Sequence, residues 1–340
     1  MVFTEEGLEA RLSLPSDADV ECMASMDGDL LILGAGGKMG PSLARLARRA
    51  ADLAGARSKR VVAVARFSDP DLATQLLADG IETVQANLLD LGALDRLPDC
   101  PNVIFMAARK FGTTGAEHLT WAMNTYLPGR VSERFRESRI VAFSTGNVYP
   151  LRPVAQGGAT ESTTPAPVGE YGQSALGRER LFEYASATWG TRVSLLRLNY
   201  AVELRYGVLS DIGRAVYERR PVDLRMGLVN VIWQGDANSI CLRSFEHCSS
   251  PPNVLNVTGP ETLPVRSVAA RFGVLFGVQV AFEGIEAEVA LLNDATKAQG
   301  LFGYPSVTAD QLIEWTAKWI RAGGRTLNKP THFQAQDGKF

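Results

Sequence analysis

The residues best suited to binding chemistry are glycines that follow a short apolar run near the N-terminus. Three of them, beginning at Gly34, form the pattern Gly-x-x-Gly-x-x-Gly between an apolar strand and a helical segment. Such glycines permit a tight turn and let a pyrophosphate approach the backbone N–H groups at the start of the helix. We therefore expect a dinucleotide-binding loop, and the alternative is a glycine-rich turn without a ligand. The residues predicted to bind are Gly34, Gly36, Gly37, Lys38, Met39 and Gly40.

The end of the second predicted strand bears on which dinucleotide binds. A carboxylate there would accept hydrogen bonds from a ribose 2′-hydroxyl and repel a 2′-phosphate. The chain instead has Arg66 followed by Ser68, and the first carboxylate is Asp69. This pattern favours NADP, with NAD as the alternative. Otherwise Arg66 is a solvated strand end or stacks on the adenine.

Later strand ends complete the predicted cofactor site. Asn87 follows the third strand, where its amide can hydrogen-bond the adenine, and Leu88 lies beside it. Ala107 and Ala108 end the fourth strand, where small side chains leave room for the dinucleotide backbone.

The elements that must position these residues alternate between strands and helices. The predicted strands occupy residues 30–33, 60–66, 81–90 with a turn, 102–108, 139–149, 192–199 and 251–259. The predicted helices occupy residues 41–54, 70–79, 115–137, 170–189, 265–277 and 308–321. This alternation predicts an α/β fold with a Rossmann-type doubly wound parallel sheet, in which ligands bind at the carboxyl ends of the strands.

The sheet domain is followed by a smaller C-terminal α+β substrate lobe. The predicted divisions are an N-terminal extension at 1–28, a dinucleotide-binding domain at 29–200, a substrate lobe at 201–325 whose segment 230–258 returns to the first domain, and a tail at 326–340. We expect the polar tail to be poorly ordered or wrapped on the surface. Candidate substrate contacts in the lobe are Arg205, Tyr206, Arg225 and Trp233, although such residues more often serve the core or ion pairs.

Charge and cysteine content argue against several classes of partner. The chain has 35 basic and 37 acidic residues and a formal charge of −2, which argues against a nucleic acid or a membrane surface. The four cysteines lack the paired spacing of a disulfide framework or a zinc site, so we expect free thiols and no metal. No apolar run approaches the roughly 20 residues of a membrane span, and no secretory signal is recognisable. We expect a cytoplasmic protein with a small-molecule substrate.

Together these motifs resemble a known superfamily. The glycine loop, the Met-Ala-Ala at 106–108, the strand ending FSTGNVY and the helix beginning YGQSALGRERL are similar to those of the extended short-chain dehydrogenase/reductases. The branch that the chain resembles most is the NAD-dependent epimerase/dehydratase family, which acts mainly on sugars and sugar nucleotides. The resemblance covers residues 29–320 and is strongest over 29–200. It implies a homodimer as a candidate assembly.

The resemblance also implies a set of catalytic residues. The hydroxyl residue that precedes the Val-Tyr pair maps onto Thr145, and Ser144 is the weaker choice. The tyrosine of Tyr-x-x-x-Lys maps onto Tyr171, which would also contact the cofactor, and the asparagine maps onto Asn124. The lysine maps onto Ala175, and this is the one departure.

The missing lysine puts the chemistry in question. A tyrosinate that accepts a carbinol proton must be stabilised, because an unperturbed tyrosine has a pKa of about 10. Thr145 would orient the substrate oxygen with a hydrogen bond. Lys110, just after the fourth strand, is the candidate that geometry favours for the missing cation, ahead of Arg109 and Arg178, which lies seven residues after Tyr171.

Two functions follow from this interpretation. The first is an NAD(P)-dependent enzyme that acts on a sugar or sugar derivative by oxidation, reduction or epimerisation through a transient keto intermediate. Dehydration is less favoured, because Gly146 and Asn147 stand where such dehydratases carry acidic residues. The second is a catalytically impaired NAD(P)-binding protein that serves as a sensor or an assembly subunit.

Overall fold

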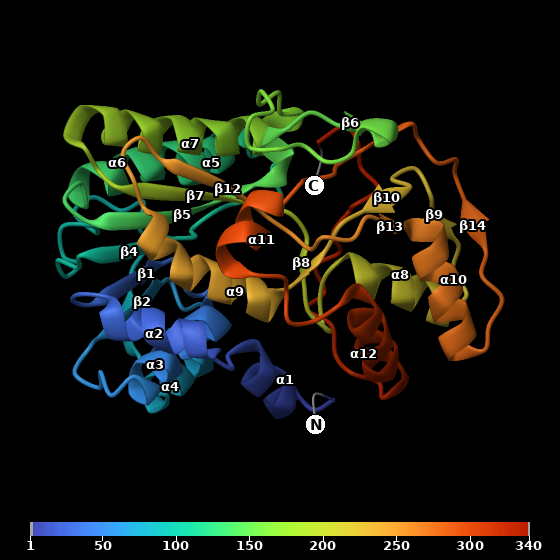
Figure 1. Ribbon diagram of the computed structural model, residues 1–340, viewed down its shortest axis with the longest axis horizontal. Helices are drawn as coiled ribbons and strands as arrows, with labels where there is room; N and C mark the ends of the chain where they lie inside the picture. Colours follow the sequence, from blue (N-terminus) through green and yellow to red (C-terminus); the bar gives the residue numbers. More distant parts are fainter. Residues whose placement is uncertain (1–2, 339–340) are drawn as a thin grey trace.

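The computed structural model describes residues 3–338 and centres on a parallel sheet of seven strands (Figure 1). The strand order is β12-β7-β5-β4-β1-β2-β3, and each neighbouring pair runs parallel. The strands are β1 (Leu30–Leu33), β2 (Val61–Ala65), β3 (Glu82–Gln85), β4 (Asn102–Phe105), β5 (Arg139–Thr145), β7 (Val193–Leu198) and β12 (Asn253–Val257). The predicted doubly wound fold is confirmed.

Helices cover both faces of this sheet because its central strands are apolar on both sides. Leu30 and Ile32 of β1 face one core together with residues of α2 (Asp17–Ser25), α3 and α9. Leu31 and Leu33 face the opposite core, which includes residues of α6 and α7. The helices of this domain are α3 (Gly40–Leu53), α4 (Pro70–Ala78), α5 (Glu117–Trp121), α6 (Leu127–Arg134), α7 (Gly169–Trp189) and α9 (Gln234–Arg243).

The predicted helix over 115–137 has an internal irregularity. A π-helical turn at Ala122–Tyr126 separates α5 from α6. Such turns occur often at functional sites, and this one carries the buried Asn124. The widened turn therefore sets the direction of a predicted site residue.

The second lobe has its own core and is built mainly from helices. Three helices, α8 (Val208–Tyr217), α10 (Val265–Phe276) and α12 (Ala309–Arg321), pack around apolar residues that include the buried Trp233. Helix α11 (Thr296–Phe302) packs instead against β12 and α9 of the sheet domain. Short strands pair as β8 (Ala201–Val202) with β11 (Ile232–Trp233), β9 (Val222–Asp223) with β14 (Phe282–Glu283), β10 (Leu228–Val229) with β13 (Leu263–Pro264), and β6 (Arg152–Pro153) with β15 (Val289–Ala290).

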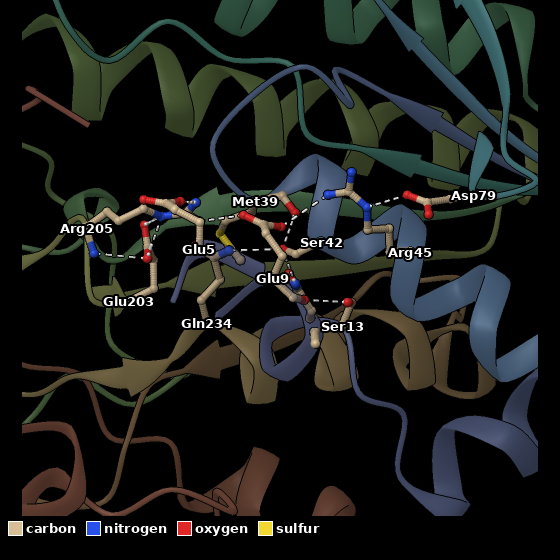
Figure 2. Close-up of polar contacts among 12 residues, drawn as sticks. Glu5, Glu9, Ser13, Met39, Ser42, Arg45, Asp79, Glu203, Arg205 and Gln234 are labelled. Atoms are coloured by element: carbon tan, nitrogen blue, oxygen red, sulfur yellow. Dashed lines mark hydrogen bonds and ion pairs between the residues drawn. The ribbon is translucent and has the colours of Figure 1, made fainter. Parts of the chain in front are cut away.

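The N-terminal extension links the two lobes. It forms α1 (Glu5–Leu12) and α2 (Asp17–Ser25), which pack beside α3 and α9. Glu9 of α1 pairs with Arg45 of α3 and with Arg205 of the second lobe, both shown in Figure 2. Arg205 also pairs with Glu5 and Glu203. These ion pairs hold α1 against both α3 of the sheet domain and Arg205 of the second lobe.

The C-terminal segment after α12 returns across the molecule. The Leu327 N–H donates to the Arg205 carbonyl, and Thr331 donates to Asp211. Phe333 is buried in the second core, and Gly338 lies against Gly169 at the start of α7. Within the described part of the chain, none of the helices has the length and apolarity needed to span a bilayer.

Candidate active site

Two cavities meet along the carboxyl edge of the sheet. One, of about 390 Å³, lies beside the ends of β2, β3 and β4. The other, of about 350 Å³, extends from the glycine loop to Tyr171 and the second lobe. Both are lined by the glycine loop, by the end of β4 and by the C-terminal segment. The residues that line both are Gly34, Gly37, Met106, Ala108 and Lys329.

The glycine loop approaches its neighbours too closely for larger residues. Gly34 has a φ of 96°, and a Cβ built there would lie 2.5 Å from the backbone nitrogen of Ala107. A Cβ on Gly40 would lie 2.2 Å from the Ala35 carbonyl oxygen. The helix that follows, α3, begins without a side-chain cap. Its first N–H groups are therefore open to an anion, and this cradle fits the diphosphate of a dinucleotide.

Residues predicted around the adenosine gather in the 390 Å³ cavity. Arg66 and Ser68 are exposed at its edge. The Asp69 carboxylate instead accepts a hydrogen bond from the Asp71 N–H and caps α4. Asn87 lines the cavity, where its side chain bonds to Asp90 and to the Leu89 N–H. The small or apolar lining includes Leu88, Ala107 and Ala108.

Thr145 and Tyr171 meet in the other cavity. The Thr145 hydroxyl, at the end of β5, accepts hydrogen bonds from the backbone and side-chain nitrogens of Asn147. Burial raises the pKa of Tyr171, while the charge of Arg178 and a hydrogen bond with Thr145 lower it. Ser144 points elsewhere, because its hydroxyl donates to the buried Glu179. Thr145 is thus the hydroxyl placed beside Tyr171.

Arg178 lies behind this pair as a buried cation. Its guanidinium donates to the Phe143 carbonyl at 2.6 Å and to the Asn124 side-chain oxygen at 3.1 Å. A longer contact of 3.4 Å reaches the Asn124 carbonyl. Burial lowers the pKa of Arg178, and the neighbouring Tyr171 raises it. The π-helical turn therefore presents Asn124 as the partner that holds the guanidinium in place.

Helix geometry explains how a residue so far along the chain reaches the tyrosine. Helical side chains tilt toward the helix N-terminus, so the long Arg178 side chain points back toward Tyr171. Ala175 lies on the same face between them. It is fully buried in a cluster with Val148, Tyr149 and Ala159. Because its side chain is small, the Arg178 side chain has room to extend along this face of α7 toward Tyr171.

Two further lysines line this cavity besides Lys329. The Lys110 ammonium lies 5.8 Å from the centre of the Tyr171 ring, and burial lowers its pKa to about 8 although Asp211 raises it. The Lys38 ammonium donates to the Ala201 carbonyl at 2.7 Å and lies 4.2 Å from the centre of the Tyr206 ring. Burial lowers the pKa of Lys38 to about 7.

The structure thus brings Thr145, Tyr171 and Lys110 into one crevice with the glycine loop, leaves Asn124 buried behind it, and separates some candidates of the second lobe from it. Tyr206 lines the cavity, whereas Arg205 is held by glutamates, Arg225 by Asp223, and Trp233 by the core. Sequence reasoning missed Asn147, whose position after Thr145 was a usable signal. It also missed Lys329 and Thr331, for which no local pattern exists. Within residues 3–338, no group of three or more His, Cys, Asp or Glu side chains is arranged to hold a metal.

Comparisons with known proteins bear on the family and the fold. Residues 30–202 match the model of the NAD dependent epimerase/dehydratase family, which confirms the resemblance seen in the motifs. No curated protein matches the chain.

Solved structures share the fold at low sequence identity. UDP-glucuronic acid 4-epimerase from Bacillus cereus, in complex with UDP-glucuronic acid and NAD, is 17% identical with a TM-score of 0.71, over 86% of this chain and 99% of that one. UDP-glucose 4-epimerase from Thermus thermophilus, in complex with NAD, is 18% identical with a TM-score of 0.70, and the match covers 86% of this chain and 99% of that one. A double mutant of dTDP-glucose 4,6-dehydratase from Streptomyces venezuelae, with NAD bound, is 18% identical with a TM-score of 0.71, and the match covers 86% of this chain and 96% of that one.

Proposed function

The chain belongs to the NAD-dependent epimerase/dehydratase family, and from that premise we propose that it is an NAD(P)-dependent enzyme that oxidises, reduces or epimerises a carbinol of a sugar derivative. The observation that carries this proposal is the meeting of Thr145, Tyr171 and Arg178 in the cavity that adjoins the glycine loop. A bound nicotinamide would supply the hydride acceptor. The side chains of this site would manage the proton and the orientation of the substrate.

In the proposed mechanism Tyr171 is the acid–base residue. Its phenolate oxygen takes the proton from the substrate hydroxyl when the carbinol is oxidised, and returns it on reduction. Thr145 donates a hydrogen bond to the same substrate oxygen, which orients the carbon that gives or receives hydride. Arg178 stabilises the tyrosinate from behind, in place of a lysine at position 175. Asn124 is a positioning residue, since it acts through Arg178.

The charge of the cavity supports an anionic substrate. Its lining includes Lys38, Lys110 and Lys329, and its described residues include no aspartate or glutamate. A cavity lined by one sign of charge raises the local concentration of ligands of the opposite sign. We therefore propose a substrate that carries a carboxylate or a phosphate, such as a sugar acid, a sugar phosphate or a sugar nucleotide. Lys110, whose ammonium lies 5.8 Å from the centre of the Tyr171 ring, would be the cation that contacts this anionic group.

A substrate panel tests the proposal. The purified protein is incubated with NAD or NADP and with neutral sugars, sugar acids, sugar phosphates and sugar nucleotides, and nicotinamide absorbance and product stereochemistry are measured. We expect turnover of anionic members in preference to their neutral counterparts. Cofactor binding without turnover of any member would instead favour the impaired NAD(P)-binding protein.

NADP is the proposed cofactor, although NAD stays as the alternative. The support is the exposed Arg66 at the cavity edge, together with an Asp69 carboxylate that is already engaged in capping α4. We expect Arg66→Ala to weaken NADPH binding about 10- to 100-fold with little change for NADH, because an arginine–phosphate pair is lost. Fluorescence titration of both cofactors measures this. The exposed Arg57 provides the matched control, Arg57→Ala, and equal effects on both cofactors would contradict the assignment.

A cytoplasmic location and a homodimer are part of the same proposal. Free cysteines are typical of reducing compartments, and the dimer is supported only by the family resemblance.

A further inference from the structure

We propose that Lys329, carried by the C-terminal segment that crosses the crevice, binds the diphosphate of the dinucleotide opposite the glycine loop. The inference rests on the proposed function, because it takes the crevice to hold a dinucleotide. It adds a cofactor ligand that lies outside the domain containing the glycine loop.

The position of Lys329 carries the argument. It lines both cavities, together with Gly34 and Gly37. A dinucleotide with its adenosine in one cavity and its nicotinamide in the other must cross their junction. The diphosphate is the part that joins the two halves, so it is the group that passes between the glycine loop and Lys329.

The backbone on each side of Lys329 is held in place. Two residues before it, the Leu327 N–H donates to the Arg205 carbonyl at 3.1 Å. Two residues after it, the Thr331 N–H and hydroxyl donate to the Asp211 carboxylate at 2.8 and 2.6 Å. Further along the chain, Phe333 is only 6% exposed and packs into the core of the second lobe, which holds the segment there. The exposed Lys329 side chain can therefore turn toward an anion without movement of its backbone.

The charges around the junction favour Lys329 over the other nearby lysine. Among the described residues that line both cavities, Lys329 is the one that carries a charge. Lys38 lies within the glycine loop, but its ammonium is engaged by the Ala201 carbonyl and the Tyr206 ring. A diphosphate bound at the uncapped start of α3 would thus receive its side-chain counter-charge from the C-terminal segment.

The test measures binding rather than turnover. ADP and adenosine are titrated as competitors of whichever reduced cofactor, NADPH or NADH, the wild-type protein binds with a change in fluorescence, on the full chain with wild-type Lys329, with Lys329→Ala and with Lys329→Arg. Lys318→Ala, on the exposed side of α12, is the charge-matched control. We expect Lys329→Ala to weaken ADP about 5- to 10-fold at low salt, with a smaller effect at high salt, and to leave adenosine unchanged. Lys329→Arg should retain most of the affinity.

The outcomes separate this inference from the function on which it rests. An equal loss for ADP and adenosine would overturn it, because the segment would then act only on the shape of the site. Unchanged ADP binding in Lys329→Ala, or an equal loss in Lys318→Ala, would also overturn it while leaving the cofactor site intact. Failure of the wild-type protein to bind either NADPH or NADH would refute the proposed cofactor and this ligand together.

Discussion

Replacing Tyr171 with phenylalanine is expected to lower kcat on the order of 1000-fold, while cofactor affinity stays close to that of the wild type. The substitution removes only the phenol oxygen, which the proposed mechanism uses to carry the substrate proton. The ring remains to fill the wall of the cavity. Steady-state kinetics on an active member of the substrate panel, with NADH titration beside it, measures both quantities.

The same helix offers a matched control for this substitution. Tyr184 of α7 is 57% exposed and lies outside the cavities, so Tyr184→Phe should leave kcat unchanged. An undiminished rate in Tyr171→Phe would remove the acid–base role from this residue. A parallel loss in both variants would point to damage of α7 rather than to lost chemistry.

Replacing Arg178 with methionine is expected to move the pH dependence of turnover to higher pH. Burial already raises the pKa of Tyr171, and the Arg178 charge is one of the two influences that lower it. Without that charge the pKa of Tyr171 rises further, so tyrosinate forms only at higher pH. In the oxidative direction, the rising limb of kcat against pH therefore shifts upward. At neutral pH, kcat should fall about 10- to 100-fold.

The pH profile distinguishes an electrostatic role from a structural one. Arg178 also bonds to Phe143 and Asn124, so its removal costs some stability, which thermal unfolding would record. Arg178→Lys keeps the charge, so we expect the rising limb of kcat against pH to stay where it is in the wild type, even if the rate declines. A methionine variant that is slower but has an unmoved limb would contradict the assignment and would return Lys110 to consideration.

A relocated cation provides a stricter version of this test. Ala175→Lys alone should not help, because the residue is fully buried and Arg178 already occupies that face of the helix. In the background of Arg178→Ala, a lysine at position 175 should recover part of the rate and move the pH limb back. Activation by Ala175→Lys alone would mean that the natural site lacks an effective cation.

Much of the sheet domain was predictable because its signals are local. Continuous apolar runs such as Leu30–Leu33 indicate strands buried on both faces, and the structure places β1 there. The last glycine of the loop is fixed within one strand-turn-helix unit, because a Cβ on Gly40 would meet the Ala35 backbone. The π-helical turn at Ala122–Tyr126 was not predictable, since its sequence continues an ordinary helical pattern.

The sequence by itself determined the family, the parallel sheet, and the candidacy of Thr145, Tyr171 and Asn124, because each depends on residue type and short-range spacing. Only the tertiary structure placed the buried charge of Arg178 where it lowers the pKa of Tyr171, whereas linear spacing had ranked Arg178 behind Lys110 as a candidate cation. It also tied Arg205 to the N-terminal helix and brought Lys329 to the two cavities that the glycine loop lines. Contacts between segments that are hundreds of residues apart leave no local pattern, since they arise when separate elements pack together.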